Sequence, residues 1–321
     1  MIRILAGALA LAVSAFGALS QEWPSRPVRI IVPFGPGSTP DGAARVIADR
    51  LQARLGQPFV IENKAGAGGN LGTDAVAKAQ PDGYTIGVSI VGPLALNTLL
   101  FPRMPYDPFR DLTPVTILGA QPSVLVVNND LPARRVEDLV ALLRRDPGRY
   151  NFASIGIGSL SHLAMEAIAM RGATRPVHIP FAGSPAAVTA LIRGDVHMSV
   201  LPAGSVVAQA EAGQIRMLAV TAARRSPLLP DVPTLRELGI AGVEADAWIG
   251  LIAPAGLPDP ILDKLGATVR DILAEPATRD RLRTQLISPD GGSAADFRAV
   301  VQAELERWGP VIRANDIRVG Q

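Results

Sequence analysis

The chain has 321 residues, of which 48% are hydrophobic and 19% charged, with a formal net charge of +2 and no cysteine. This composition is that of a globular protein of about two domains, at roughly 150 residues each. The lack of cysteine excludes thiol catalysis, thiolate metal sites and disulfides, and scattered basic residues with 4% aromatics offer no surface typical of nucleic-acid binding.

Residues 1–20, MIRILAGALALAVSAFGALS, combine one early arginine with an apolar run. Ala18 and Ser20 have the spacing that signal peptidase accepts, which predicts a secretory signal peptide cleaved before Gln21. The apolar run, at about 15 residues, falls short of the roughly 20 that a membrane-spanning helix needs. We therefore expect export rather than anchoring by this segment.

Short β-branched segments alternate with helical periods in the first hundred residues of the mature chain, a pattern typical of α/β proteins with parallel sheets. Strands are predicted at 28–34, 59–63 and 84–90, and helices at 41–55, 70–79 and 93–100. In the first helix Ala44, Ile47, Leu51 and Leu55 form one apolar stripe. The proline-rich segment 101–114 predicts a connection.

A second βα series follows this connection. Strands are predicted at 115–119, 123–128, 151–156, 177–181, 195–201 and 215–222, with helices at 134–145 and from about 159, 184 and 203. A strand at 248–254 and two or three amphipathic helices between 258 and 315 depart from this rhythm. Such helices would cap the first domain and make it discontinuous.

Four glycine-rich loops stand where a strand passes into a helix. They are GPGSTPD (35–41), AGAGGN (65–70), SIGIGSLSH (154–162) and FAGSPAA (181–187). A helix start offers unpaired N–H donors and a partial positive charge, glycine permits close approach to the backbone, and serine or threonine adds a hydroxyl. Because only Lys64, Asp41 and His162 bring fixed or titratable charge to these loops, the pattern predicts a small anion held by neutral dipoles between two domains.

Enzyme sites find little support in the same loops. The G-x-G-x-x-G pattern that begins at Gly66 would need glycine at position 71, where the chain has Leu71, so a nucleotide cofactor is disfavoured. Ser159 and His162 lack a G-x-S-x-G elbow, and Ser159 is better interpreted as a helix N-cap than as a nucleophile. No general base is paired with a nucleophile, and we expect no cofactor.

The three histidines of the chain show no spacing typical of a metal site, and we expect no metal. His178 and His197 lie in strand patterns and are predicted to be structural. Asp41 has two interpretations, either a favourable charge or N-cap at the start of the 41–55 helix, or a direct ligand contact.

Eight blocks of sequence in order resemble the substrate-binding proteins of tripartite tricarboxylate transporters, the Bug (TctC-like) family. The resemblance covers residues 23–314, and its blocks are FGPGSTPD…AR, GQPFVIENKAGAGGNLG, PDGYT, YDPFRDLTPV, NFASIGIGSLSHLAMEAI, HIPFAGSPAA, LPDVPTLRELG and LIAPAGLPDPILDKL. Single blocks are weak signals, whereas all eight in sequence are highly specific.

The resemblance implies a two-domain α/β clamshell of the periplasmic-binding-protein type, each domain a mainly parallel sheet flanked by helices. Domain 1 would comprise residues 23–122 and 246–321, and domain 2 residues 123–245. The protein would be a periplasmic monomer without enzyme activity. It would capture a small carboxylate (dicarboxylate, tricarboxylate, acidic amino acid or aromatic acid) and deliver it through transient contact with a membrane permease.

Family members hold a ligand carboxylate with backbone amides, hydroxyls and water, and this implies a set of ligand-binding positions here. They are Phe34, Pro36, Gly37, Ser38, Thr39, Asp41, Gly66, Ala67, Gly68, Gly158, Ser159, His162 and Gly183. The chain departs from the family pattern at Ser38, usually glycine, at Phe181 and Ala182, usually tyrosine and lysine, and at Thr189, frequently an acid. The half of the site that reads the remainder of the ligand is therefore less defined than the carboxylate-holding half.

Two alternatives stay open from sequence. One is a secreted α/β enzyme acting on a small carboxylate, and the other is a binding protein that presents its ligand to a membrane sensor. An enzyme would need a residue whose replacement abolishes turnover but spares binding, and the sequence names none.

Overall fold

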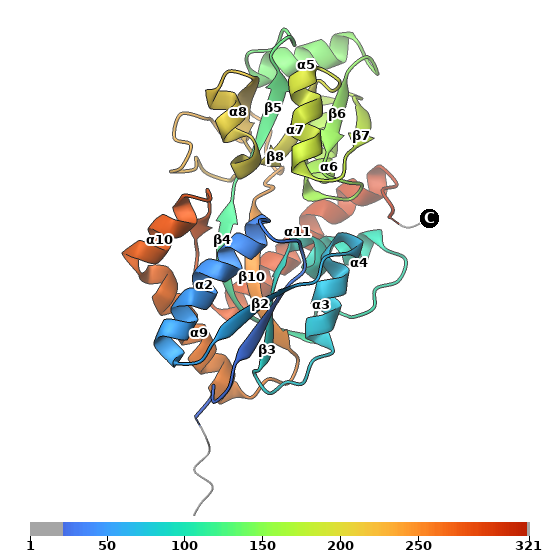
Figure 1. The fold of residues 1–321 in the computed structure, drawn as a ribbon. Coiled ribbons are helices and arrows are strands. Elements are labelled where there is room, and N and C mark those ends of the chain that lie inside the picture. The colour runs from blue at the N-terminus through green and yellow to red at the C-terminus, as the bar shows by residue number, and fades with distance from the viewer. Residues whose placement is uncertain (1–21, 320–321) are drawn as a thin grey trace, which may run out of the picture.

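The structure, a computed structural model, describes residues 22–319 and has two lobes, each built on one β-sheet flanked by helices (Figure 1). The predicted signal peptide lies outside the described residues. Across residues 22–319, no helix is both long and apolar enough to cross a membrane.

The elements of the two lobes follow one another along the chain. The first lobe contains β1 (Val28–Val32), α2 (Thr39–Leu55), β2 (Phe59–Asn63), η1 (Ala67–Gly69), α3 (Asn70–Ala77), β3 (Thr85–Ile90), the π-helical turn η2 (Gly92–Leu96), α4 (Asn97–Leu100), β4 (Leu112–Gln121), β10 (Ala247–Pro254), α9 (Asp259–Ala274), α10 (Pro276–Arg283), β11 (Ser288–Pro289) and α11 (Ala294–Ala314). The second lobe contains β5 (Ser123–Asn128), α5 (Val136–Arg145), β6 (Asn151–Ser154), α6 (Leu160–Gly172), β7 (Val177–Pro180), α7 (Ser184–Arg193), β8 (Met198–Pro202), η3 (Ala203–Ser205), α8 (Val207–Glu211) and β9 (Ile215–Val220). The chain thus leaves the first sheet after β4 and returns with β10, and we keep the predicted domain boundaries near 122 and 245 as a proposal.

The two-domain α/β architecture predicted from the sequence is confirmed, but both sheets are mixed rather than mainly parallel. The first sheet has the order β11-β4-β10-β3-β1-β2, and the second has the order β7-β6-β8-β5-β9. β1 pairs in parallel with β2 and β3, whereas β10 is antiparallel to both β3 and β4. In the second sheet β6 is parallel to β7 and β8, whereas β5 is antiparallel to β8 and β9.

The antiparallel pairs have a topological cause. Strands that are followed by a helix-starting loop run toward the other lobe, and β4 runs the same way because it carries the chain across (Figure 1). β10 must enter the first lobe from the second, so it runs in the opposite direction, as β5 does on entering the second lobe. The βα repeat in the sequence reports the parallel strands but carries no signal for the crossing strands.

Helix α2 shows how the local sequence sets an element of the fold. Ala44, Ile47 and Leu51 are buried, as the apolar stripe predicts. The helix begins at Thr39 rather than at 41, because Ser38 takes the extended N-cap conformation. It ends at Gly56, whose left-handed φ of 71° closes the last turn.

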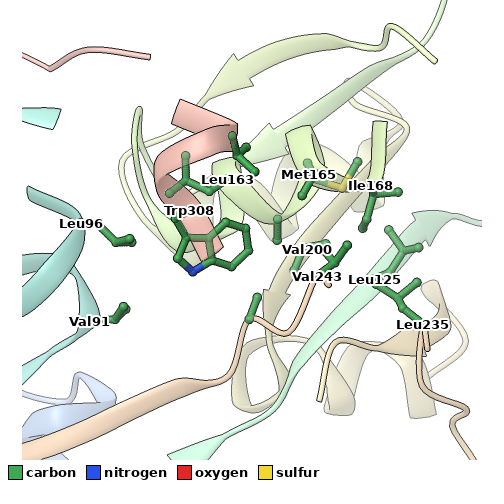
Figure 2. Close-up of a cluster of buried hydrophobic side chains, with 14 of the residues drawn as sticks. Val91, Leu96, Leu125, Leu163, Met165, Ile168, Val200, Leu235, Val243 and Trp308 are labelled. Atoms are coloured by element: carbon green, nitrogen blue, oxygen red, sulfur yellow. The ribbon is translucent and has the colours of Figure 1, made fainter. Parts of the chain in front are cut away.

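The C-terminal helices do not all cap the first lobe as expected. α9 and α10 pack beside α2, but α11 lies between the lobes and contacts both β4 and α6. Figure 2 shows the indole of Trp308, in α11, between Leu96 of the first lobe and Leu163 of the second, within one continuous buried cluster. Buried Glu304 accepts hydrogen bonds from Trp308 Nε1 (2.5 Å) and Trp248 Nε1 (3.3 Å). The lobes therefore share a core on this side, which leaves the loops at the strand ends to form the cleft.

Candidate ligand-binding site

A cleft of about 1610 Å³ lies between the lobes and is lined by residues from both. The structure brings together all of the predicted site residues on its walls except Gly66 and His162. Those on the walls are Phe34, Pro36, Gly37, Ser38, Thr39, Asp41, Ala67, Gly68, Gly158, Ser159 and Gly183. Three of the four glycine-rich loops thus face the cleft with the starts of α2, α6 and α7, and the fourth contributes Ala67 and Gly68.

The loop between β1 and α2 presents an uncommitted hydroxyl. Ser38 is the N-cap of α2, yet its side chain makes no capping hydrogen bond, and its Oγ is buried without a partner. Gly37, before it, has φ of +80°, a conformation that L side chains rarely adopt. A buried hydroxyl without a partner is unfavourable, so this loop has an unused hydrogen-bonding group next to the cleft.

Asp41 holds this loop in place. The Oδ2 atom accepts hydrogen bonds from Gly37 N (2.9 Å) and Arg45 Nε (2.9 Å), and Oδ1 accepts from a terminal Arg45 nitrogen (3.0 Å) and Asn63 Nδ2 (2.9 Å). Burial acts to raise the pKa of Asp41, but hydrogen bonds from Arg45, Gly37 and Asn63 outweigh it and hold the pKa below its usual value. With all four lone-pair sites of the carboxylate occupied, the geometry favours a positioning role for Asp41, at the third residue of the helix rather than at its N-cap.

A buried amide pair supports the loop after β2. The backbone of residues 66–69 has positive φ throughout, and Asn97 Nδ2 donates to Asn70 Oδ1 (2.6 Å) and to the Gly68 carbonyl (3.4 Å). Ala67, Gly68 and Asn97 line the cleft, whereas Gly66 does not. Sequence reasoning missed Asn97, although a polar residue within the apolar run VGPLALNTLL could have signalled it.

In the second lobe, the loop between β6 and α6 uses its serine internally. Ser159 is the N-cap of α6, where its Oγ accepts from His162 N (3.3 Å) and donates to the Gly156 carbonyl (2.7 Å). The N-cap interpretation is confirmed. The His162 ring bonds Gly158 N–H rather than the Ser159 hydroxyl, so these two residues do not form a nucleophile and base.

His162 lies behind this loop rather than on the cleft wall. Its side chain is buried, and its Nδ1 accepts the Gly158 N–H at 3.1 Å. The ring stacks on His178 with centroids 3.7 Å apart and an interplanar angle of 12°. His178, which the sequence predicts to be structural, also contacts Ser154 of the same loop (2.7 Å). Direct contact of His162 with a ligand is therefore not what this arrangement favours.

The loop before α7 completes the wall of the second lobe. The N-cap of α7 is Gly183, which has no side chain to cap the helix. Ser184 and Pro185 follow it on the cleft surface. Thr189 Oγ1 donates to the Pro185 carbonyl (2.9 Å) within the helix. The starts of α6 and α7 thus lie on the second-lobe side of the cleft, and the start of α2 lies on the first-lobe side beside Ala67 and Gly68.

The described walls of the cleft carry few charges. The ionisable side chains among the lining residues of 22–319 are Asp41, Arg45 and Glu211, and the Arg45 guanidinium is already bonded to Asp41. In the same part of the chain, no group of three histidine, aspartate or glutamate side chains is placed to hold a metal ion. An anion in this cleft would therefore meet backbone N–H groups and hydroxyls rather than a free cation.

Sequence reasoning missed one entire end of the cleft. This end is lined by residues from β4, α8 and the turn after α10, namely Gln121, Val207, Ala208, Glu211, Thr284, Gln285 and Leu286. Gln121 Nε2 donates to the Gln285 carbonyl at 2.7 Å, which ties the crossing strand to that turn. No local motif could have identified these residues, because the turn reaches the cleft only through the packing of α10 beside α2.

Sequence comparisons match the chain to a single protein family. The family model described as "Tripartite tricarboxylate transporter family receptor" matches residues 43–317. A relative from Pseudomonas sp. (strain P51), named "UPF0065 protein in tcbD-tcbE intergenic region", is 38% identical over 97% of this chain and 93% of its own length. Protein BugT of Bordetella pertussis is 35% identical over 98% of this chain and 96% of its own length.

Solved structures agree with the sequence matches. Rpa4515 of R. palustris, described with adipate, has a TM-score of 0.84 and 37% identity, covering 92% of this chain and 99% of that protein. MatC of Rhodopseudomonas palustris, described with bound malate, has a TM-score of 0.78 and 34% identity, covering 90% of this chain and 100% of that protein. With a family match over most of its length and relatives above 30% identity, the chain belongs to the tripartite tricarboxylate transporter receptor family, which includes the Bug proteins.

Proposed function

We propose that this protein is a periplasmic solute-binding protein that captures a small carboxylate in the cleft between its lobes. The observation that carries the proposal is the start of α2, where Ser38 lines the cleft, its hydroxyl has no partner, and residues 22–319 place no free cation on the wall. A carboxylate would satisfy this hydroxyl and the unpaired N–H groups of the helix start. The relatives described with adipate and malate support a carboxylate as the ligand class.

The affinity that such a site can provide is adequate for transport. Each charge-assisted hydrogen bond contributes about 1.5–3 kcal/mol, and a handful of them is sufficient for micromolar binding at about −8 kcal/mol. Neutral donors also make release simple, because no buried ion pair has to be broken. The family to which the chain belongs supports delivery to a membrane permease through transient contact, and we propose that the protein does this as a monomer.

Capture rather than chemistry is favoured by the contacts of the polar groups in the cleft. Ser159 is used as a helix cap, His162 as an acceptor for a backbone N–H, and Asp41 as a brace for its loop. None of these three is left as a nucleophile, base or acid. Presentation to a sensor would use the same site, and no feature of the described residues favours it over transport.

The decisive experiment measures binding by the exported protein, purified without refolding, with Gly37→Asp as the test variant. Isothermal titration with adipate, malate, citrate, aspartate and benzoate should find at least one ligand, and its binding should persist in EDTA. An aspartate at position 37 places a second carboxylate beside Asp41 at the start of α2, where it repels a bound acid and competes for its donors. Loss of two charge-assisted bonds would weaken affinity about a hundredfold or more.

Gly56→Asp is a matched control. Gly56 also has positive φ (+71°) and, like Gly37, has no neighbouring atom within 4 Å of the point that a Cβ would occupy, but it lies at the opposite end of α2. Both variants therefore carry the same strain and charge, and only Gly37→Asp should lose binding. Wild-type protein that binds none of the five acids, or folded Gly37→Asp that binds as tightly as wild type, would refute the proposed site.

A further inference from the structure

Two histidines from different elements form a stacked pair under the loop between β6 and α6. The ring of His162, in α6, lies 3.7 Å from that of His178, in β7, at an interplanar angle of 12°. Phe152, in β6, packs against both rings, with its centroid 4.9 Å from that of His178 and 6.0 Å from that of His162. The pair therefore lies behind residues 155–159, which line the cleft on their other side.

Both histidines bond this loop directly. His162 Nδ1 accepts the Gly158 N–H (3.1 Å), so the proton of a neutral ring lies on Nε2, which faces Glu166 Oε1 at 3.6 Å. His178 Nε2 lies 2.7 Å from Ser154 Oγ. The Ser154 hydroxyl in turn donates to the Gly156 carbonyl (3.0 Å) and accepts the Gly156 N–H (3.2 Å). Two ring nitrogens thus set the conformation of both ends of the loop.

The other bonds within the loop come from Ser159, whose N–H and hydroxyl both donate to the Gly156 carbonyl (3.2 and 2.7 Å). The loop sequence, SIGIGS, contains two glycines with φ of +131° and +73°, and Ile157 between them is 51% exposed. A segment with two flexible residues and an exposed apolar side chain can adopt many conformations, so it loses conformational entropy when it is ordered. Hydrogen bonds from a rigid pair of rings order the loop before a ligand binds. The entropy cost of ordering is then not paid on binding, and affinity increases.

The pair acts in this way only while it is uncharged. A proton on His162 Nδ1 would replace an acceptor with a donor opposite the Gly158 N–H. Burial, with a smaller effect from the neighbouring His162, lowers the pKa of His178 to about 4. The charged group that faces the pair is Glu166, on α6, and the stacking partner from β6 is apolar Phe152.

We propose that His162 and His178 are positioning residues, a neutral stacked pair that holds loop 154–159 in the conformation that receives the ligand. The inference rests on the proposed function, because it concerns one wall of the proposed carboxylate site. It assigns His162 an indirect role in place of the ligand contact implied by the resemblance. It also gives His178, predicted as structural, a share in binding.

The test compares His162→Asn with His162→Leu. Asparagine Oδ1 is attached to Cγ, as Nδ1 is in histidine, so His162→Asn can still accept the Gly158 N–H but carries no titratable ring. Leucine fills similar space and accepts nothing. Adipate is the probe, replaced by malate, citrate, aspartate or benzoate if one of these binds wild type more tightly. Hydrogen exchange of the Gly158 amide, followed by NMR without any ligand, reports the loop itself.

His162→Leu should weaken affinity about tenfold, the equivalent of one hydrogen bond, and accelerate Gly158 exchange about tenfold. His162→Asn should remain within about threefold of wild type in both measurements. His197→Asn is the control, because His197 is the third histidine of the chain and bonds Asn151 rather than loop 154–159. It should leave both measurements unchanged.

Two results would overturn the inference. One is equal affinity and equal Gly158 exchange in wild type and folded His162→Leu. The other is a loss of affinity that is equal in His162→Leu and His162→Asn and that follows their fall in melting temperature. That result would indicate a packing role alone. Since the exchange measurement needs no ligand, it remains valid if no acid binds wild type, so failure of the proposed function and failure of this inference are distinguishable.

Discussion

The first-lobe loop (residues 35–41) and the second-lobe loop (residues 154–159) both end a strand and start a helix, yet they are held by different chemistry. The first-lobe loop is braced by the carboxylate of Asp41, which bonds Gly37, Arg45 and Asn63. The second-lobe loop is braced by neutral groups, the rings of His162 and His178. The two sides of one cleft therefore respond differently to substitution and to acid.

Their serines differ in the same sense. Ser38 caps its helix by position only, and its hydroxyl has no partner. The Ser159 hydroxyl accepts a hydrogen bond from the first turn of α6 and donates one to the Gly156 carbonyl. A hydroxyl without a partner is available to a ligand, whereas a capping hydroxyl contributes to stability. We infer that the first lobe holds the carboxylate and that the second lobe mainly closes over it.

The largest effect is expected from Asp41→Asn, which removes the charge of the brace but keeps its shape. One oxygen becomes an NH₂ group that must face Gly37 N–H, Arg45 or Asn63, all of which are donors to Asp41. Unsatisfied donors in this buried position cost about 1–3 kcal/mol of unfolding free energy, and the released loop should lose tenfold or more in affinity. Urea unfolding and calorimetric titration measure the two losses.

Asp138→Asn is the control for that experiment. Asp138 occupies the same third position in α5 and accepts hydrogen bonds from the N–H groups of Arg134 and Arg135, but it does not line the cleft. It should lower stability less and leave affinity unchanged. If Asp41→Asn behaved like Asp138→Asn, the carboxylate would be an ordinary helix-start charge and not the brace of the site.

A second comparison replaces each serine with alanine. Ser38→Ala should weaken affinity about tenfold, because one charge-assisted bond to the ligand is lost, while the unfolding free energy hardly changes. Ser159→Ala should show the reverse pattern, a loss of about 1 kcal/mol of stability from the missing cap with a smaller change in affinity. Equal effects of the two substitutions on affinity would show that both lobes hold the carboxylate alike.

Sequence patterns identified most of the first-lobe loop and of the second-lobe loop because both depend on local signals. Glycine and serine after an apolar strand mark a helix start, and the structure places Ser38 and Ser159 at N-caps. The apolar stripe of α2 was equally visible. The alternation of strands and helices does not predict the direction of β5 and β10, because direction depends on which lobe a strand enters.

The braces of the two loops were beyond sequence reasoning for a related physical reason. Asn63 reaches Asp41 from the next strand, and His178 reaches Ser154 from β7, so each contact joins positions more than twenty residues apart. A single sequence contains no signal that pairs them. His162 belongs to the predicted set of site residues, but its direction, away from the cleft, depends on the stack with His178.

The last comparison uses acid, which should act on the two loops at different pH values. Hydrogen bonds from Arg45, Gly37 and Asn63 hold the pKa of Asp41 below its usual value, so its brace persists into acid. The pKa of His178 is lowered to about 4, mainly by burial, from an ordinary value near 6.5. Between pH 6.5 and about 4, His178 binds a proton in the unfolded chain but not in the folded protein. The free energy of unfolding therefore falls as the pH falls through this range.

We expect the ring signals of His178, assigned in ¹H–¹³C NMR spectra by their absence from His178→Phe, to titrate with a midpoint near pH 4. The contribution of this titration to acid destabilisation should vanish in His178→Phe, which keeps the stack without a titrating group. Amide exchange should then show the second-lobe loop loosening at a higher pH than the first-lobe loop. A midpoint near 6.5 would mean that solvent reaches the ring freely, and the contrast between a charged brace and a neutral one would no longer separate the two loops.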